Sequence, residues 1–326
     1  MGKPKRIDAT AGRHSLVDTI PFTLPVRGAK SPVFFAVFPI SAKKAAPLLP
    51  GNEVHPVRLW GDKGLLVVTV IDYRETNIGK YIEYSIGIAC TFGEKPAPPL
   101  LPGLFMKKYG TGQFIFDLPV STDVSVKGGK GIWGMPKHRA SLNYVITDAK
   151  VSSQYDLDGQ LGTYVEIERP RSVKKDFETG SFHWGGPYGI ALNLCFAVGA
   201  VNYAAFRGML FRSFIYFQGD IAFAIGKHAR GRLVVGDLPR HGPLKELDGD
   251  YDNPLFTAYI PEMTGVLDDH CESWFLSTAT APAPAMEGME SVVDLPRAEV
   301  WPPPPTAPVP GVPDAPHPTT SVVDET

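Results

Sequence analysis

The sequence is poor in cysteine and carries almost no net charge. Three cysteines, Cys90, Cys195 and Cys271, lie far apart in 326 residues. This argues against a disulfide framework or a thiolate zinc site and is typical of a reduced, cytoplasmic protein. The formal net charge of −2 gives no electrostatic basis for binding nucleic acid or an acidic membrane surface. We therefore expect a cytoplasmic protein with neither nucleic acid nor membrane as a partner.

Long apolar runs are also scarce. The segment 184–206 has no charged residue, but its glycines and its proline leave a stretch at the short edge of what can cross a bilayer. Its apolar residues recur at helical spacing, which favours a buried amphipathic helix over a membrane span. These residues are Ile190, Leu194, Val198, Val201 and Ala205. The basic N-terminus lacks a following apolar run, so no secretory signal is expected.

What the sequence does contain is a series of short strand-like runs. Residues 81–90 alternate between a face of large apolar residues and a face of smaller or polar ones, which predicts a strand. Ser41 is predicted to cap a short helix over 42–46. Further strands are predicted at 32–39, 65–72, 113–118, 142–147, 161–168, 213–217, 221–225 and 232–235. With 33 glycines in turns, the pattern indicates a mainly β, mostly antiparallel architecture with few helices.

The two ends of the chain differ in composition from the middle. Residues 1–20 are polar and irregular, which predicts a mobile N-terminal arm. Residues 302–326 carry nine prolines and predict a disordered or polyproline-like tail outside the fold. A single domain is therefore expected over residues 21–301.

The segment 128–142 is the strongest candidate for a functional site. It holds four glycines and Pro136, followed directly by Lys137, His138 and Arg139. So many residues with special backbone conformations beside reactive nitrogens favour a chain positioned for chemistry, although a surface loop with a few cations is the alternative. Residues 129–134 formally match the dinucleotide motif G-x-G-x-x-G. Because no helical pattern follows, nucleotide binding is not expected.

Three segments resemble the acetoacetate decarboxylase family. Residues 133–138 (WGMPKH) are similar to its active-site segment, in which a lysine forms a Schiff base with a β-keto acid. Residues 79–83 (GKYIE) are similar to its G-x-Y-x-E segment, and residues 295–300 (LPRAEV) to its closing strand. The resemblance implies a curved antiparallel β-sheet closed into a cone or barrel, with a few peripheral helices. It also implies a homo-oligomer that needs no metal or organic cofactor.

The same resemblance assigns roles to residues of this chain. Lys137 would be the nucleophile; only a neutral amine attacks a carbonyl, so burial or a nearby cation is needed to favour loss of its proton. Glu83 would shuttle protons or orient the substrate. If the lysine segment is extended, Arg139 shares the face of Lys137 and His138 lies on the opposite one. The residues expected to bind substrate or tune the lysine are His138, Arg139, Tyr81, Trp133 and Met135.

Two family features are missing. Where relatives place an arginine before the first strand, this chain offers only Arg27 or Lys30, and where they carry a first glutamate it reads Leu66-Val-Val68. The sequence therefore predicts a Schiff-base lyase acting on a small oxo acid, with decarboxylation through an imine and enamine as the first hypothesis. The alternatives are an aldolase–dehydratase using the same imine and a non-catalytic small-molecule-binding protein. No metal site is indicated, because Asp268–Cys271 is dense in possible ligands but has no partner cluster.

Overall fold

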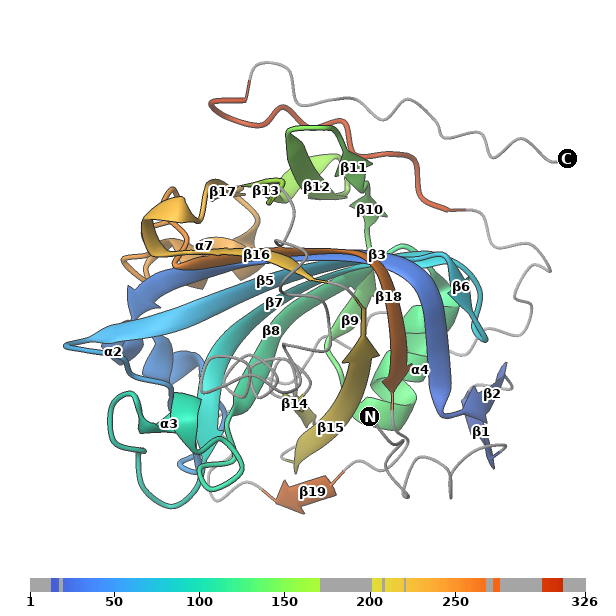
Figure 1. Ribbon diagram of the computed structural model, residues 1–326. Helices are drawn as coiled ribbons and strands as arrows, with labels where there is room; N and C mark the ends of the chain where they lie inside the picture. Colours follow the sequence, from blue (N-terminus) through green and yellow to red (C-terminus); the bar gives the residue numbers. More distant parts are fainter. Residues whose placement is uncertain are drawn as a thin grey trace, which may run out of the picture.

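The computed structural model describes residues 13–17, 20–170, 201–206, 209–219, 221–267, 272–275 and 301–312. They form a mainly β structure with few helices, arranged in three sheets (Figure 1). The central 12-stranded sheet runs, in pairing order, through β16 (Ala222–Ile225), β18 (Phe256–Leu267), β15 (Met209–Gln218), β14 (Val201–Phe206), β8 (Gly112–Val120), β7 (Tyr81–Phe92), β5 (Lys63–Tyr73), β3 (Val26–Ser41) and β6 (Glu75–Thr76). Beside this path, β4 (Val54–Pro56) pairs with β7, β9 (Lys137–Arg139) with β8, and β19 (Glu272–Phe275) with β15.

Pairing in the central sheet is antiparallel except where β8 pairs in parallel with β14 and β9. Strand β18 also pairs with β3, in addition to its pairings with β15 and β16. The long strands β3, β5, β7 and β8 run side by side and curve together (Figure 1).

The second sheet contains β10 (Ser141–Leu142), β12 (Lys150–Leu157), β13 (Gln160–Glu168) and β17 (Gly231–Val235), with β11 (Val145–Ile146) beside β12. The third pairs β1 (Arg13–Val17) with β2 (Ile20–Leu24). The helices are α2 (Ala42–Ala45), α3 (Leu101–Leu104), α4 (Asp123–Trp133) and α7 (Gly242–Lys245), with 3₁₀ turns η1 (Ala46–Leu48), η3 (Gly226–His228) and η4 (Pro239–His241). Within the described ranges, no helix is long and apolar enough to cross a bilayer.

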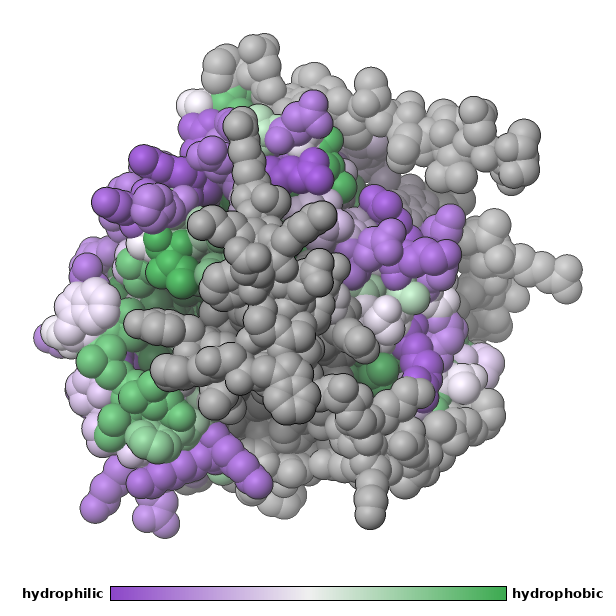
Figure 2. Space-filling view, viewed as in Figure 1, coloured by the Kyte–Doolittle hydropathy of each residue, from purple (hydrophilic) through white to green (hydrophobic). Residues whose placement is uncertain are grey.

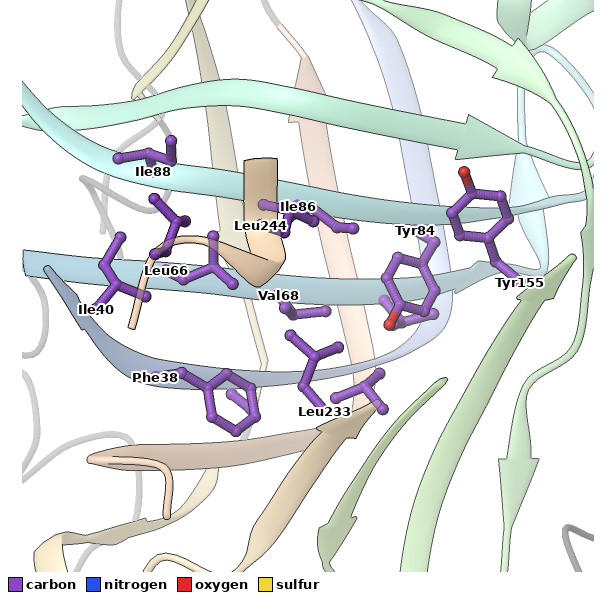
Figure 3. Packing of buried hydrophobic residues seen from close by; sticks show 14 of the residues in the cluster. Phe38, Ile40, Leu66, Val68, Tyr84, Ile86, Ile88, Tyr155, Leu233 and Leu244 are labelled. Carbon is purple, nitrogen blue, oxygen red and sulfur yellow. The ribbon is translucent and has the colours of Figure 1, made fainter. Parts of the chain in front are cut away.

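The two faces of the central sheet differ in what lies against them. Because side chains alternate along a strand, Leu66, Val68 and Val70 of β5 point to one face, where they are fully buried against the second sheet and α7. Figure 3 shows this core, in which Leu233 of β17 and Leu244 of α7 pack with residues of the long strands. The alternate residues of β5 line a cavity on the other face. In the described part of the chain, one face therefore carries the main core, whereas the other lines the cavity and packs in a smaller cluster around Ile71 and Tyr73.

Most predicted strands are confirmed, as is the cap of the first helix, where the Ser41 hydroxyl accepts from the backbone N–H of Lys44. The helix predicted within 184–206 is wrong for Val201–Phe206, which form β14. The predicted strand 142–147 is broken, because the Asn143 side chain accepts the backbone N–H of Gln154. Most of that predicted helix, the segment 268–271 with its possible metal ligands and the predicted closing strand 295–300 cannot be compared, because residues 171–200, 268–271 and 295–300 lie outside the described ranges. The prediction of a mobile arm does not hold for residues 13–17, because they form strand β1, which pairs with β2.

The described part of the predicted tail, residues 302–312, does not lie outside the fold. Residues 301–312 run along the second sheet, where Asp156 Oδ2 accepts the backbone N–H groups of Thr306 (2.8 Å) and Ala307 (2.7 Å). Gln154 donates to the Ala307 carbonyl at 2.7 Å. Ala307 and Val309 are buried in a small apolar cluster with residues of β13. A side chain that satisfies two backbone donors replaces the regular pairing that prolines prevent.

We expect Asp156→Ala to lower the free energy of unfolding by about 1–3 kcal/mol, because it leaves two backbone donors without their acceptor in a largely buried position. Urea denaturation measures the change. The exposed Asp148, in the turn before β12, provides the control: Asp148→Ala should stay within about 0.5 kcal/mol of the parent. Equal effects of the two substitutions would contradict a structural role for the docked tail.

Candidate active site

Lys137 is the first residue of β9 and lies deep inside the protein. The helix α4 ends at Gly134, whose positive φ of 63° suits glycine, and Pro136 then fixes the backbone directly before the lysine. In β9, Lys137 pairs with Leu118 of β8. Only 4% of the lysine side chain is exposed. The local backbone thus holds the amine in place, as the sequence predicts.

The amine of Lys137 has two polar partners. Its Nζ donates to Glu83 Oε2 at 2.7 Å and to Ser125 Oγ at 2.9 Å. It also lies 5.4 Å from the centroid of the Tyr81 ring. A buried ammonium requires such a carboxylate and hydrogen-bonding shell, since an isolated charge away from water is very costly. Glu83 and Lys137 can therefore exchange a proton directly.

Helix α4 forms the wall beside the lysine, and the sequence analysis missed it. Thr122 caps its N-terminus, but three glycines within it lower its helix propensity. Ser125 and Gly129 are four residues apart and so share one face of the helix, the face turned toward Lys137. A Cβ added at Gly129 would lie 2.3 Å from Lys137 Cδ. The cap and this i, i+4 pair are the signals that could have revealed both the helix and Ser125.

Strand β7 supplies the carboxylate and an aromatic floor. Tyr81, Glu83 and Ser85 all face the cavity, the same side of the strand that the alternating pattern predicts. The Tyr81 ring stacks on Tyr73 of β5, with 4.5 Å between their centroids. Burial, and then the charge of Glu83, raise the pKa values of both phenols well above normal. Both tyrosines therefore remain hydrogen-bond donors at neutral pH.

The other predicted residues separate into two groups. Met135 lines the cavity with Lys137, Glu83 and Tyr81. Trp133 is buried instead in an apolar cluster with residues of β2 and β8 and is not among the described residues that line the cavity. The described residues enclose a cavity of about 540 Å³ with the lysine at its wall.

The sequence matches the family model for acetoacetate decarboxylase over residues 10–180, just over half of the chain. This chain belongs to the acetoacetate decarboxylase family. No curated protein shows a significant sequence match. Among solved structures, the acetoacetate decarboxylase of Legionella pneumophila is similar at a TM-score of 0.54 and 11% identity, over 77% of this chain and 87% of that one. An acetoacetate decarboxylase-like enzyme from Sphingomonas wittichii gives 0.52 and 12%, over 77% and 94%. MppR, an enduracididine biosynthesis enzyme solved with pyruvate, gives 0.51 and 12%, over 76% and 90%.

Two features expected of this family are absent from the described lining. Lys30, a candidate for the missing arginine, is exposed and pairs with Glu75 at 2.8 Å, and Arg27 does not line the cavity. On β5, the residue paired with Glu83 is Ile71, so no second carboxylate faces the first from that strand. Lys137 and Glu83 are the charged members of the described lining. The described residues also contain no cluster of three potential metal ligands.

His138 and Arg139, which were predicted to bind substrate or tune the lysine, are not among the described residues that line the cavity. The Arg139 guanidinium lies 2.8 Å from an Asp123 oxygen at a partly exposed position. His138 faces the opposite side of β9, as extended backbone requires, and its Nε2 is 2.8 Å from Asp117 Oδ1. Alternation alone predicts the histidine's direction. Its partner lies on another strand and could not be predicted.

Asp117 is the centre of a buried polar network behind the lysine strand. Besides His138, its carboxylate contacts His241 Nε2 at 2.9 Å and the Tyr155 hydroxyl at 3.0 Å. Burial alone would raise the pKa of the Asp117 carboxyl, but the charges and hydrogen bonds of His138 and His241 hold it well below its usual range. The network joins β8 and β9 to the second sheet and α7 region, and so fixes the strand that carries Lys137.

We expect Gly129→Ala to destabilise the protein, although alanine ordinarily favours a helix by about 1 kcal/mol over glycine. The new methyl would overlap the lysine stem, at a cost of about 1–3 kcal/mol, and would move Nζ from Glu83. Gly103→Ala in α3, where nothing lies within 4 Å, is the control in urea denaturation. Equal unfolding free energies would show that the lysine stem does not need this glycine.

Asp117→Asn should cost about 3 kcal/mol at neutral pH, because it removes a buried charge whose partners stay behind. A carboxyl with a depressed folded pKa stabilises above its unfolded value, near 3.9, and this stabilisation is lost as the pH falls through the folded value. The parent should therefore lose stability progressively below about pH 4, and Asp117→Asn should lose less. Urea unfolding at several pH values between 7 and 3 measures both. An unchanged acid slope in the variant would contradict this assignment.

Proposed function

We propose that this chain is a Schiff-base-forming lyase that decarboxylates an oxo acid through an imine on Lys137. The observation that carries the proposal is the buried Lys137 amine, held between Glu83 and Ser125 at the wall of a cavity. A water-poor site of this kind suits imine chemistry, because water would otherwise hydrolyse the intermediate and solvate the ammonium. Membership of the acetoacetate decarboxylase family supports the same reaction class.

The first stage joins the amine to the substrate. Glu83 accepts a proton from the Lys137 ammonium across their 2.7 Å contact, and the neutral Nζ attacks the ketone carbon. The resulting carbinolamine loses water after Glu83 returns a proton to its oxygen. The product is a protonated imine, in which the carbon bonded to the positive nitrogen lies β to the carboxylate.

In the second stage the bond between the α-carbon and the carboxylate breaks. Carbon dioxide leaves, and the electron pair of that bond moves to the nitrogen and forms an enamine. A proton delivered to the α-carbon restores the iminium, and water then hydrolyses it to a ketone and the free lysine. Glu83 is the group placed to relay these protons.

Substrate orientation would come from neutral donors in place of the missing arginine. The raised pKa values of Tyr73 and Tyr81 keep their hydroxyls protonated beside Glu83. The buried Ser85 hydroxyl faces the cavity and has no hydrogen-bond partner in the described part of the chain. A bound oxygen of the substrate can use this group.

We also infer that the central sheet closes into a cone around this site. Support comes from β18, which pairs with β3 from Phe256 to Leu267 and, through its final residues, also pairs with β15. Closure would remove exposed strand edges and shield the imine from solvent.

An aldolase–dehydratase using the same imine is the second candidate. It is favoured by the shortage of positive charge, since no described lining residue other than Lys137 carries a cation for a β-keto carboxylate. The similarly folded MppR, solved with pyruvate, is a relative in which an α-oxo acid is bound. In such a reaction the imine would lose an α-proton instead of carbon dioxide, and the enamine would attack an aldehyde.

Borohydride reduction in the presence of acetoacetate or pyruvate tests the imine. We expect a mass adduct on Lys137, because reduction converts the imine into a stable secondary amine. Lys137→Arg keeps the positive charge but cannot form the imine and should show no adduct. Lys108→Arg, at an exposed position, should label like the parent.

The products then separate the candidate functions. Carbon dioxide release from acetoacetate supports decarboxylation, whereas a condensation product from pyruvate and an aldehyde supports the aldolase. If the parent binds oxo acids without any adduct, the imine proposal is wrong and the chain is a binding protein on the same scaffold.

A further inference from the structure

The cavity is much longer than a four-carbon acid requires. Its inner wall follows β5 from Tyr73, beside the reactive lysine, to Leu65. Ile71 pairs with Glu83 and so marks the reactive end. Because a strand advances about 3.3 Å per residue, Leu65 lies roughly 20 Å farther along the wall. A volume of about 540 Å³ falls within the range of pockets that hold drug-sized ligands.

Charge and apolar surface lie at opposite ends of this cavity. Lys137 and Glu83 are together at the reactive end, with Tyr73, Tyr81 and Ser85 nearby. Toward the other end the described lining is mostly apolar and includes Val57, Leu59, Leu65, Val67, Ala89 and Met106, with Thr111 and Gln113 as uncharged polar members beside Ala89 and Met106. Water against such walls is unfavourable, and an apolar chain that displaces it gains free energy with every buried carbon.

The far end of the cavity meets an exposed apolar rim. Trp60 and Ile225 both line the cavity, yet they are 56% and 53% exposed. Leu104 and Phe105, at α3 and directly before the lining residue Met106, are 60% and 53% exposed. Figure 2 shows apolar residues gathered over α3 on this face of the molecule. Large exposed apolar side chains that continue into a cavity indicate a route for an apolar ligand.

We propose that the site takes a 3-oxo acid with an unbranched, medium-length alkyl chain, its oxo acid head at Lys137 and its chain along β5 and β7 toward Trp60. This rests on the proposed function, because the same imine on Lys137 performs the reaction. Decarboxylation then releases carbon dioxide and a methyl ketone that keeps the alkyl chain. The site selects by burying the chain, since the described lining offers the head group few charged contacts.

A chain-length series tests the proposal. The substrates are 3-oxobutanoate, 3-oxohexanoate, 3-oxooctanoate and 3-oxodecanoate, with carbon dioxide release and the borohydride adduct on Lys137 as separate readouts. Each buried methylene is worth about a fourfold gain in kcat/KM, so the four additional methylenes of 3-oxooctanoate should raise kcat/KM over that of 3-oxobutanoate by roughly 250-fold.

Variants at the distal wall locate the chain. Ala89 lies six residues along β7 from Glu83, and a phenylalanine there would fill the channel. Val67, on the neighbouring strand β5, provides a second position if the first variant folds poorly. In Ala89→Phe or Val67→Phe the ratio of kcat/KM for 3-oxooctanoate over 3-oxobutanoate should fall at least tenfold. Ile146→Phe, on the second sheet away from the cavity, is the matched control and should keep the parent ratio.

The outcomes distinguish this inference from the proposed function. An adduct and carbon dioxide release at similar efficiency for all four acids would overturn the chain-length preference and leave the imine chemistry standing. An unchanged ratio in both distal variants would overturn the assigned path of the chain. No adduct with any acid would overturn the imine itself, and with it the substrate proposed here.

Discussion

The close contact between the Lys137 amine and the Glu83 carboxylate is the interaction on which the site depends. Neither group would be stable alone at this depth, because an unpaired buried charge is strongly disfavoured. Their meeting needs strands β7, β8 and β9 in register and a helix whose backbone comes unusually close to the lysine stem. Gly129 makes that approach possible, at the expense of helix propensity. Close packing thus accounts for two glycines of the segment, with Gly129 against Lys137 and Gly128 against Phe22.

In the central sheet, the face that carries the main core is not the face that carries Glu83 and the cavity. One face of β5 and β7 is packed against the second sheet, whereas the other lines a cavity where packing is incomplete. Such a cavity lowers the stability of the fold, because the side chains that line it lose dispersion contacts. The Asp117 network lies on the packed side, directly behind strand β9. Through His138 it ties the strand that carries Lys137 to the second sheet, and so holds the reactive amine in position.

Local sequence patterns predicted what depends on neighbouring residues. Alternation placed Glu83 on the cavity face, and Pro136 indicated a fixed lysine. The sequence did not predict helix α4, because its glycines are poor helix formers. Their close contacts with Phe22 and Lys137 exist only in the folded chain. Trp133 and Arg139 were misplaced for a related reason: nearness to Lys137 in sequence does not decide which cluster a side chain joins. The partners of His138 come from distant strands, and no local pattern carries that information.

The docked proline-rich segment has a consequence for how the chain reaches its final form. Gln154 and Asp156 bind residues about 150 positions later, so the outer surface of the second sheet stays incomplete until residues 301–312 have been synthesised. Until then, Leu161 and Tyr164 lack the covering provided by Ala307 and Val309. A nascent chain that has not yet reached residue 301 leaves these apolar side chains uncovered, so the second sheet completes its packing late in synthesis.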